Sequence, residues 1–399
     1  MITEKKIDEW LQEVEERPWS AHVIIHSIAS RLNHLTKWNE ELLAENIQLR
    51  AGEKVDEYEK RIANLEYQLE LLKRQFAGEI PVASERLPAS AQNQEINLIL
   101  YHPQGKILRF ALNSEEFVSS NEIASFRKAP WQKEDAPHLL VTSSSEELLL
   151  LFDSGRTVVH PAAEIPASDL DRLEWEQALF EEPRAGERLA AIVPVAKMSL
   201  FEFCLQFSRK GYVKKIREDF FETYLSNQYL GTGTKLKFDK TCGLLFCNSE
   251  EQLVLATKEG YLFRVDVNKL PLAIEEVVRL NSTDYVIAAF IARRNHSILA
   301  VTQNGKLIHR ETDWLEPAEA LNTKGQPLFS KSRRDSGVHL VGAASVSEQD
   351  WCLACTSNGK LISYRIGDLF ASGALLPRDS QIEVVEIATF QIEDSKSSD

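Results

Sequence analysis

Two short patterns in the sequence have a spacing that could hold a metal ion. Cys352 and Cys355 are three residues apart, and His22 and His26 are four apart in a segment with a helical period. A structural zinc site needs four ligands, and no further pair completes either pattern. On a strand, residues three positions apart point to opposite faces of the sheet. We therefore expect buried core cysteines, histidines packed along a helix, and no metal site.

The motifs of common active sites are also missing. No glycine-rich phosphate loop precedes a helix, and neither Gly-x-Ser-x-Gly nor His-Glu-x-x-His occurs. Five cysteines are an odd and sparse set for a chain of 399 residues, which favours a reducing compartment. There is no signal-peptide pattern and no apolar run near the roughly 20 residues that a bilayer requires. We expect a cytoplasmic protein that is not an enzyme, needs no cofactor and does not enter a membrane.

The remaining candidates for chemistry are cations at and just after six regularly spaced glycines. A track of such cations is what binding to a phosphate backbone requires. Alternatively, lysines and arginines on hairpins are solvated and protect strand edges, and the formal net charge of −14 favours this second interpretation. The candidate DNA-binding residues are Lys106, Arg109, Arg156, Arg209, Lys210, Lys214, Lys215, Lys258, Arg264, Lys306, Arg310, Lys360 and Arg365.

These cations belong to a unit that recurs six times. Each copy has four mostly apolar residues, a polar pair or triplet, a glycine and a second strand, as in Leu253–Ala256 before Gly260. The glycines are 45 to 56 residues apart, which leaves room for about four strands per unit. A polar residue precedes each glycine, as a tight hairpin with positive φ demands. We expect a mainly β, six-bladed propeller or pinwheel over residues 95–378, closed as a flat ring or wound as an open spiral. The glycines are Gly105, Gly155, Gly211, Gly260, Gly305 and Gly359.

Residues 1–77 carry a different, helical period. Apolar residues follow heptad a and d rows in two registers separated at Ala51-Gly52, and two asparagines continue the first a row. Such asparagines fix register and favour a parallel two-stranded coil. We expect a homodimer held by this coiled coil, although three strands, or one helix folded onto the same chain, would give a similar pattern. The expected contacts are Ile28, Leu35, Asn39, Leu42, Asn46, Ile62, Leu65, Leu69 and Leu72.

Two further segments have neither period. Residues 78–94 are rich in Pro, Ala and Ser, which is the composition of a linker. Residues 379–399 contain an acidic block that includes Glu383, Glu386, Glu393 and Asp394, and we expect an acidic tail there.

Two of the repeated units, Thr257–Arg264 and Ser208–Lys215, resemble blades of a known family. They are similar to the C-terminal domain of the A subunit of DNA gyrase and topoisomerase IV, a six-bladed β-pinwheel that binds DNA. The resemblance covers residues from about 95 to 375. It does not include the DNA-cleaving domains, for which residues 1–90 leave no room. The glycine- and arginine-rich box with which gyrase wraps DNA is also missing, since Gly231–Lys235 lacks the paired arginines.

The resemblance implies binding rather than catalysis. We expect a non-enzymatic protein that contacts the DNA backbone or is associated with DNA topology, with two pinwheels tethered by the coiled coil. The alternative is an interaction scaffold whose pinwheel binds a protein partner and not DNA, which the acidity and the missing box favour.

Overall fold

The computed structural model describes residues 95–113, 122–126, 137–168, 183–184, 186–195, 198–231, 239, 241–377 and 381–391. In the N-terminal segment it describes only Ala21, Ile25 and Ala29, which are helical. The chain divides into two compact units, residues 1–88 and 89–399. All the expected coiled-coil contacts and the expected linker at residues 78–94 lie outside the described residues. Both stay predictions.

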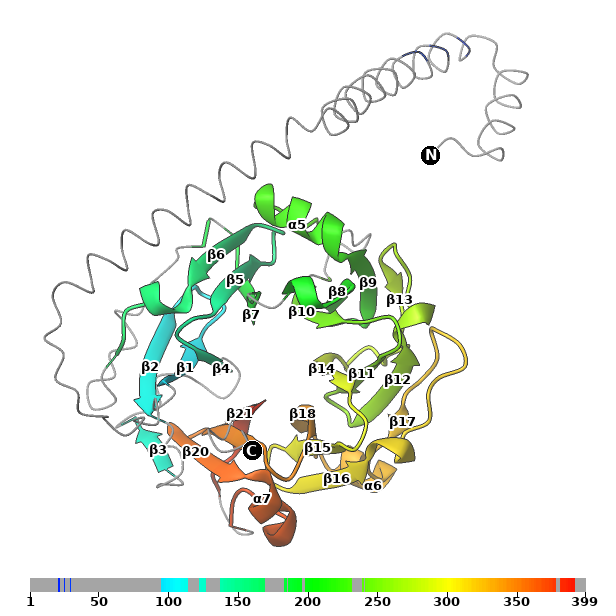
Figure 1. Cartoon of the computed structure of the whole chain (residues 1–399). Coiled ribbons are helices and arrows are strands. Elements are labelled where there is room, and N and C mark those ends of the chain that lie inside the picture. The colour runs from blue at the N-terminus through cyan, green and yellow to red at the C-terminus, as the bar shows by residue number, and fades with distance from the viewer. Residues whose placement is uncertain are drawn as a thin grey trace, which may run out of the picture. The chain divides into compact units, whose positions relative to one another are not determined.

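The described part of the second unit is mainly β, as predicted, and contains six antiparallel sheets set around a common centre (Figure 1). We number the sheets 1 to 6 in chain order and write each in the order in which its strands are hydrogen-bonded. Sheets 1 to 3 are β2-β1-β4 (Ile107–Asn113, Glu95–Tyr101, His138–Ser143), β6-β5-β7 (Thr157–Pro161, Glu147–Phe152, Leu189–Pro194) and β10-β8-β9-β13 (Thr241–Cys247, Phe203–Ser208, Tyr212–Arg217, Glu275–Glu276). Sheets 4 to 6 are β14-β11-β12-β17 (Val286–Ala292, Gln252–Thr257, Tyr261–Asp266, Gln326–Pro327), β16-β15-β18 (Leu307–Glu311, Ser297–Thr302, Leu340–Val346) and β21-β19-β20-β3 (Val384–Phe390, Trp351–Thr356, Lys360–Arg365, Glu122–Ser125). Short helices connect the strands: α5 (Glu218–Ser226), α6 (Lys331–Asp335), α7 (Ile366–Ser372) and the 3-10 turns η3 (Ala162–Glu164), η5 (Met198–Leu200), η6 (Val267–Lys269) and η7 (Thr312–Trp314).

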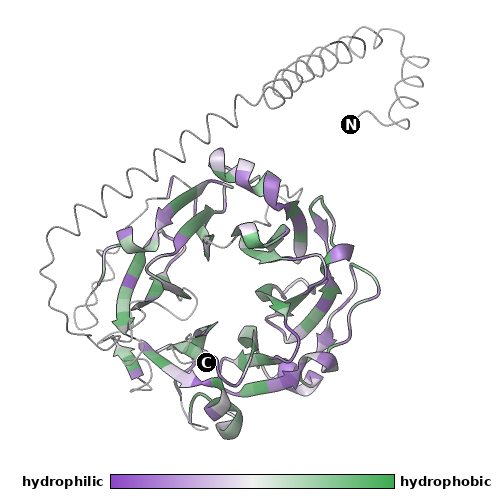
Figure 2. Cartoon of the chain, viewed as in Figure 1, coloured by the Kyte–Doolittle hydropathy of each residue, from purple (hydrophilic) through white to green (hydrophobic). Residues whose placement is uncertain are grey.

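The repeated apolar quartets form the strands that run through the middle of the sheets. Both faces of such a strand are covered by neighbouring sheets, so the run is continuously apolar rather than alternating. Leu148 to Leu151 of β5, for example, are completely buried, with alternate residues in two different core clusters. Figure 2 shows the apolar residues concentrated on the strands. Each of the six core clusters lies between consecutive sheets, and one joins sheet 6 to sheet 1 through Leu353, Leu98 and their neighbours.

Neighbouring sheets also exchange strands at their outer edges. β13 lies between β12 and β14 in the chain, yet it pairs with β9 of sheet 3. In the same way β17 lies between β16 and β18 of sheet 5 in the chain, yet it pairs with β12 of sheet 4. β3, from the segment of sheet 1, pairs with β20 of sheet 6. The first and last sheets are therefore joined by backbone hydrogen bonds as well as by a shared core.

The repeated glycines are the points where this exchange takes place. All six have the positive φ expected for tight hairpins, between 75° and 94°. The carbonyl of five of them accepts a hydrogen bond from the next segment: the donors to Gly155, Gly211, Gly260, Gly305 and Gly359 are the amides of Leu230, Val277, Leu328, Leu375 and Phe126, at 2.7–2.9 Å. The missing side chain lets the neighbouring segment approach. A Cβ on Gly260 would lie 2.3 Å from the ring of Phe329, and one on Gly155 would lie 2.6 Å from the carbonyl oxygen of Leu230.

The predicted boundary between the pinwheel and an acidic tail at residue 378 is too early. β21, Val384–Phe390, pairs along its length with β19. Glu383 and Glu386 make the segment look like an acidic tail, but Val384 is buried against sheet 5 and Ile387 packs in the same cluster. Residues 392–399, with the rest of the acidic block, lie outside the described residues.

The exchange predicts an unequal response to two glycine substitutions. Gly260→Ala should lower the free energy of unfolding by about 3 kcal/mol, since it combines the cost of positive φ with a clash against Phe329. Gly337→Ala has the same positive φ, 84°, but nothing within 4 Å of its Cβ, so only the backbone cost of about 1 kcal/mol applies. Urea denaturation followed by tryptophan fluorescence measures both. Equal losses would show that the close approach at Gly260 contributes nothing.

Candidate nucleic-acid interface

Three of the predicted DNA-binding cations are structural ties between sheets. Arg109, Lys215 and Arg264 each lie four residues after a repeated glycine, and each reaches a 3-10 turn of the following sheet. Arg109 Nε donates to the carbonyl oxygen of Ile165 at 2.6 Å. Lys215 Nζ donates to that of Val267 at 3.0 Å. Arg264 donates to those of Thr312 and Leu315 at 2.9 and 2.8 Å.

Burial makes the first two of these cations poor ligands for DNA. Arg109 is buried and also donates to Asn97 Oδ1 at 2.7 Å. Lys215 is buried, with its ammonium 4.9 Å from the ring of Phe203. This burial lowers the pKa of the Lys215 ammonium, because desolvation disfavours its charged form. Contact between either side chain and a phosphate would have to replace these internal hydrogen bonds.

Three more predicted cations have partners within the protein. The first, Arg156, is paired with Glu187 at 3.0 Å and lies 3.7 Å above the Phe152 ring. Burial alone would raise the pKa of the Glu187 carboxyl, but hydrogen bonds from Arg156, Ser154 and the Arg184 amide hold it at about 2.

Lys210 and Lys360 join neighbouring sheets in a similar way. Lys210 Nζ donates to the carbonyl oxygens of Ser282 and Asp284 at 3.0 and 2.9 Å. Lys360 pairs with Glu122 of β3 at 2.7 Å. Contact between Arg156, Lys210 or Lys360 and a phosphate would compete with these existing partners.

The other seven predicted cations lie at or near the surface. Arg209, Lys306, Arg310 and Arg365 are exposed, and Lys106, Lys214 and Lys258 are half-buried. Lys306 directly precedes the hairpin strand β16, Arg310 is the penultimate residue of that strand, and Arg365 ends β20 of the next sheet. The Arg310 guanidinium carbon lies 5.4 Å from the centre of the Trp314 ring, and the residue is exposed. Three of these four exposed cations, Lys306, Arg310 and Arg365, therefore lie on or next to the hairpin strands of sheets 5 and 6.

A second group of cations, of which sequence reasoning missed Lys324, surrounds a hollow of about 700 Å³ between sheets 4 and 5. Lys258 shares this hollow with Lys324, Lys331 and Arg334. The run from Lys331 to Arg334 is visible in the sequence as a basic segment. Lys324 carries no such signal, because the strand exchange alone brings it to the hairpin of sheet 4.

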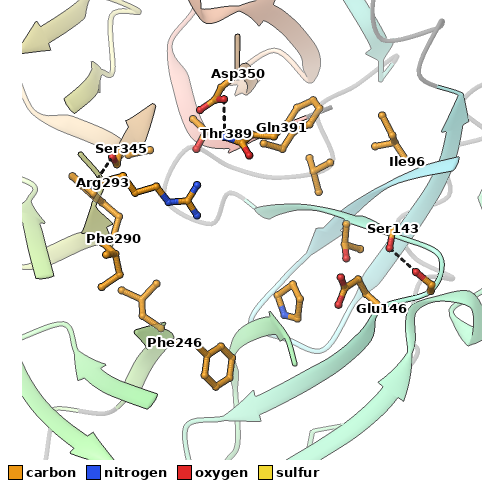
Figure 3. Close-up of a pocket in the computed structure, with 18 of the residues that line it drawn as sticks. Ile96, Ser143, Glu146, Phe246, Phe290, Arg293, Ser345, Asp350, Thr389 and Gln391 are labelled. Carbon is orange, nitrogen blue, oxygen red and sulfur yellow. Dashed lines mark hydrogen bonds between the residues drawn. The ribbon is translucent and has the colours of Figure 1, made fainter. Parts of the chain in front are cut away.

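A larger hollow of about 900 Å³ opens at the opposite ends of the sheets, among the innermost strands (Figure 3). Phe246 and Phe290 lie on one side, and Arg293 projects toward the space. Two pairs of polar side chains in this hollow are hydrogen-bonded to each other: the hydroxyls of Ser143 and Ser145 are 3.0 Å apart, and Gln391 donates to Asp350 at 3.1 Å. None of the described residues that line it is a histidine or cysteine. The hollow thus offers no nucleophile paired with an imidazole base.

The two cysteines of β19 belong to the core. Cys352 and Cys355 are buried in different core clusters, on opposite faces of β19, as predicted. Within the described ranges, no three His, Cys, Asp or Glu side chains come together as a metal site. No helix in the described part of the chain is both long and apolar enough to cross a bilayer.

The ties between sheets predict a stability difference between two arginines. Arg109→Met should lower the free energy of unfolding by about 2 to 4 kcal/mol, since it leaves the buried acceptors on Asn97 and Ile165 without their donor. Arg365→Met removes an exposed arginine and should change stability by less than about 0.5 kcal/mol. Thermal unfolding followed by circular dichroism compares them. A stable Arg109→Met variant would show that this arginine is not a tie.

Comparison with known proteins gives a consistent result at low sequence identity. No protein-family model matches the chain. The A subunit of DNA gyrase from Haemophilus influenzae is 23% identical over 277 residues, which cover 61% of this chain and 31% of that protein. The gyrase A subunit from Salmonella typhimurium is 22% identical over 322 residues, which cover 77% of this chain and 36% of that protein. The chain thus spans about a third of the length of these relatives.

Solved structures agree with the fold. A C-terminal domain of DNA gyrase A superposes with a TM-score of 0.57 at 15% identity, over 74% of this chain and 100% of that domain. The C-terminal domain of a DNA topoisomerase IV superposes with a TM-score of 0.50 at 18% identity, over 75% of this chain and 95% of that one. The resemblance expected from the repeats is therefore confirmed: the described part of the second unit has the fold of a gyrase-like C-terminal pinwheel domain.

Proposed function

We propose that this protein binds the backbone of duplex DNA through a six-bladed, ring-shaped pinwheel, and that it is not an enzyme. The observation that carries the proposal is the likeness of the pinwheel fold to C-terminal domains of DNA gyrase A and topoisomerase IV. The chain matches only about a third of the gyrase subunits that resemble it, so DNA cleavage is not part of the proposal. Each of the six sheets would be one blade.

The outer strands of sheets 5 and 6 are the proposed contact surface. Lys306, Arg310 and Arg365 are exposed there and belong to adjacent sheets. Cations on successive blades can follow a phosphate backbone without reading bases, because phosphate contacts fix position and carry no sequence information directly. Because the arginine-rich box is missing, we expect the pinwheel to contact DNA without wrapping it tightly.

The N-terminal coil would tether two such pinwheels in a cytoplasmic homodimer. The two a-row asparagines and the a and d rows support a parallel two-stranded coil. Sedimentation equilibrium of the full chain should therefore return twice the monomer mass of 45.3 kDa. Replacing Leu35 and Leu42 by Asp should return the monomer mass, and a monomeric native chain would contradict the proposal.

The DNA proposal predicts a salt-dependent affinity that falls when the outer-strand cations are removed. In a salt titration of duplex binding, the logarithm of the association constant should fall linearly with the logarithm of salt concentration. The double variant Arg310→Gln, Arg365→Gln should reduce that slope by about 2, since each lost phosphate contact removes about 0.9. The double variant Arg293→Gln, Arg294→Gln removes the same charge from the loop between β14 and β15, and should change the slope by much less.

Two results would contradict this proposal. One is the absence of duplex binding at low ionic strength. The other is an equal loss in both double variants, which would indicate attraction without a defined surface. The net charge of −14 favours a protein-binding scaffold as the second candidate function. Affinity capture of one protein partner, unchanged by nuclease treatment, would support the scaffold if duplex binding is absent.

A further inference from the structure

Two tyrosine rings on the hairpin side of sheets 3 to 5 are each accompanied by two cations from other parts of the chain. The ring of Tyr285 has Arg209 Cζ at 5.5 Å and Lys258 Nζ at 5.2 Å. The ring of Tyr261 has Lys324 Nζ at 4.5 Å and Arg334 Cζ at 4.8 Å. Both tyrosines are half-buried, and Arg209 and Lys324 are exposed.

These two clusters lie in two hollows that share lining residues. The hollow of about 700 Å³ is lined by Tyr261, Lys324 and Arg334. A neighbouring hollow of about 600 Å³, toward the centre of the sheets, is lined by Arg209 and Tyr285. Lys258 and His339 line both. We call Arg209, Lys258, Tyr261, Tyr285, Lys324 and Arg334 the tyrosine groove. Its cations and aromatic rings come from the segments of three consecutive sheets, 3 to 5.

Hydrogen bonds hold the middle of the groove in place. The buried carboxylate of Asp284 accepts from the amides of Glu259 and Tyr285, both at 2.9 Å. The amide of Lys258 donates to the carbonyl oxygen of Tyr285 at 2.9 Å. Gly260, packed on Phe329, sets the turn that is followed directly by Tyr261. The two rings thus stand on backbone that is fixed before any ligand arrives, which lowers the entropic cost of binding.

The charge of the groove favours an anionic ligand at the Tyr261 end. Lys258, Lys324, Lys331 and Arg334 line that hollow against two carboxylates, those of Glu259 and Asp335. The Glu259 carboxylate accepts hydrogen bonds from Thr283 and Asn281 at 2.7 and 2.8 Å, so its oxygens are already engaged.

The Tyr285 end is closer to neutral. Arg209 and Lys258 face Glu383 and Glu386 there, and His138 and His339 line the same hollow. An anionic chain entering from the outer end would therefore meet its strongest attraction first, near Tyr261.

We propose that the tyrosine groove binds single-stranded nucleic acid, with two nearby bases stacked on Tyr261 and Tyr285 and the phosphates between them held by the four cations. Bases stack on exposed aromatic rings regardless of sequence, and a basic groove that tracks the backbone completes such sites. The flexible cations above the rings would move from ring to phosphate as a base takes their place. Bases inside a duplex are already stacked, so this activity goes beyond the proposed duplex contact.

Fluorescence anisotropy with a labelled oligothymidylate of about 12 nucleotides tests this at low salt, using the full-length protein. Tyr261→Leu and Tyr285→Leu should each weaken binding about 10- to 100-fold, the range that loss of one stacked base produces. Tyr261→Phe and Tyr285→Phe keep the aromatic face and should bind within about threefold of the native chain.

Tyr212 provides a matched control for the aromatic substitution. It directly follows Gly211, as Tyr261 follows Gly260, and it is also half-buried, but it lies on sheet 3 outside the groove. Tyr212→Leu should leave oligothymidylate binding unchanged. Circular dichroism and thermal unfolding of every variant separate a lost site from a lost fold.

Several outcomes would overturn the inference: no binding of the oligothymidylate, leucine variants that bind like the native chain, or phenylalanine variants as weak as the leucine ones. The result is separable from the duplex proposal, because Arg310→Gln with Arg365→Gln should weaken duplex binding alone. A folded protein that binds duplex normally and loses no single-strand affinity in the tyrosine variants would refute the groove and leave the duplex proposal standing.

Discussion

The structure depends on a hydrogen bond between neighbouring sheets. The carbonyl of the hairpin glycine in one sheet accepts it from a backbone amide in the chain segment of the next sheet. Positive φ turns the glycine carbonyl toward that segment, and the absent side chain lets it come close. A sheet of three or four strands has exposed edges and only a small core of its own, so it needs its neighbours on both sides. The glycine contact provides one of those neighbours at five of the six junctions in the described part of the chain. The core clusters, the exchanged strands and the groove between sheets 4 and 5 all rest on it.

The same junctions explain why many of the cations face inward. A 3-10 turn leaves carbonyl groups without partners inside the turn, and a long cationic side chain from the previous sheet can reach them. Arg109, Lys215 and Arg264 do this at one repeat position. At the same position in sheet 5, His309 instead stacks on Phe370 of α7, at 3.9 Å between ring centres. The side chain at this repeat position therefore joins neighbouring sheets. It is a cation where the next sheet offers carbonyl oxygens and a histidine where it offers an aromatic ring.

The repeat and the hairpins could be predicted from the sequence because both are local. Four apolar residues, a polar pair and a glycine predict a strand that ends in a tight hairpin. Six evenly spaced copies of that hairpin predict sheets repeated around a centre. The partners of the cations could not be predicted, because Arg264 meets Thr312 and Leu315 about fifty positions further along the chain. β21 was misjudged for a related reason: its glutamates are visible in the sequence, but its pairing with β19 is not. Lys324 and Tyr261 come together only through strand exchange, so the groove has no signature in either segment alone.

Strand exchange between the first and last sheets has a consequence for how the protein is made. Glu122 of β3 and Lys360 of β20, which form an ion pair across that junction, are 238 residues apart. On the ribosome, β3 emerges long before the sheet that it completes, and the outer face of sheet 1 has no cover until sheet 6 is synthesised. Edges and apolar surface left open in this way attract other chains. The junction between sheets 6 and 1 can therefore form only after sheet 6 has left the ribosome, and sheet 1 needs protection during that interval.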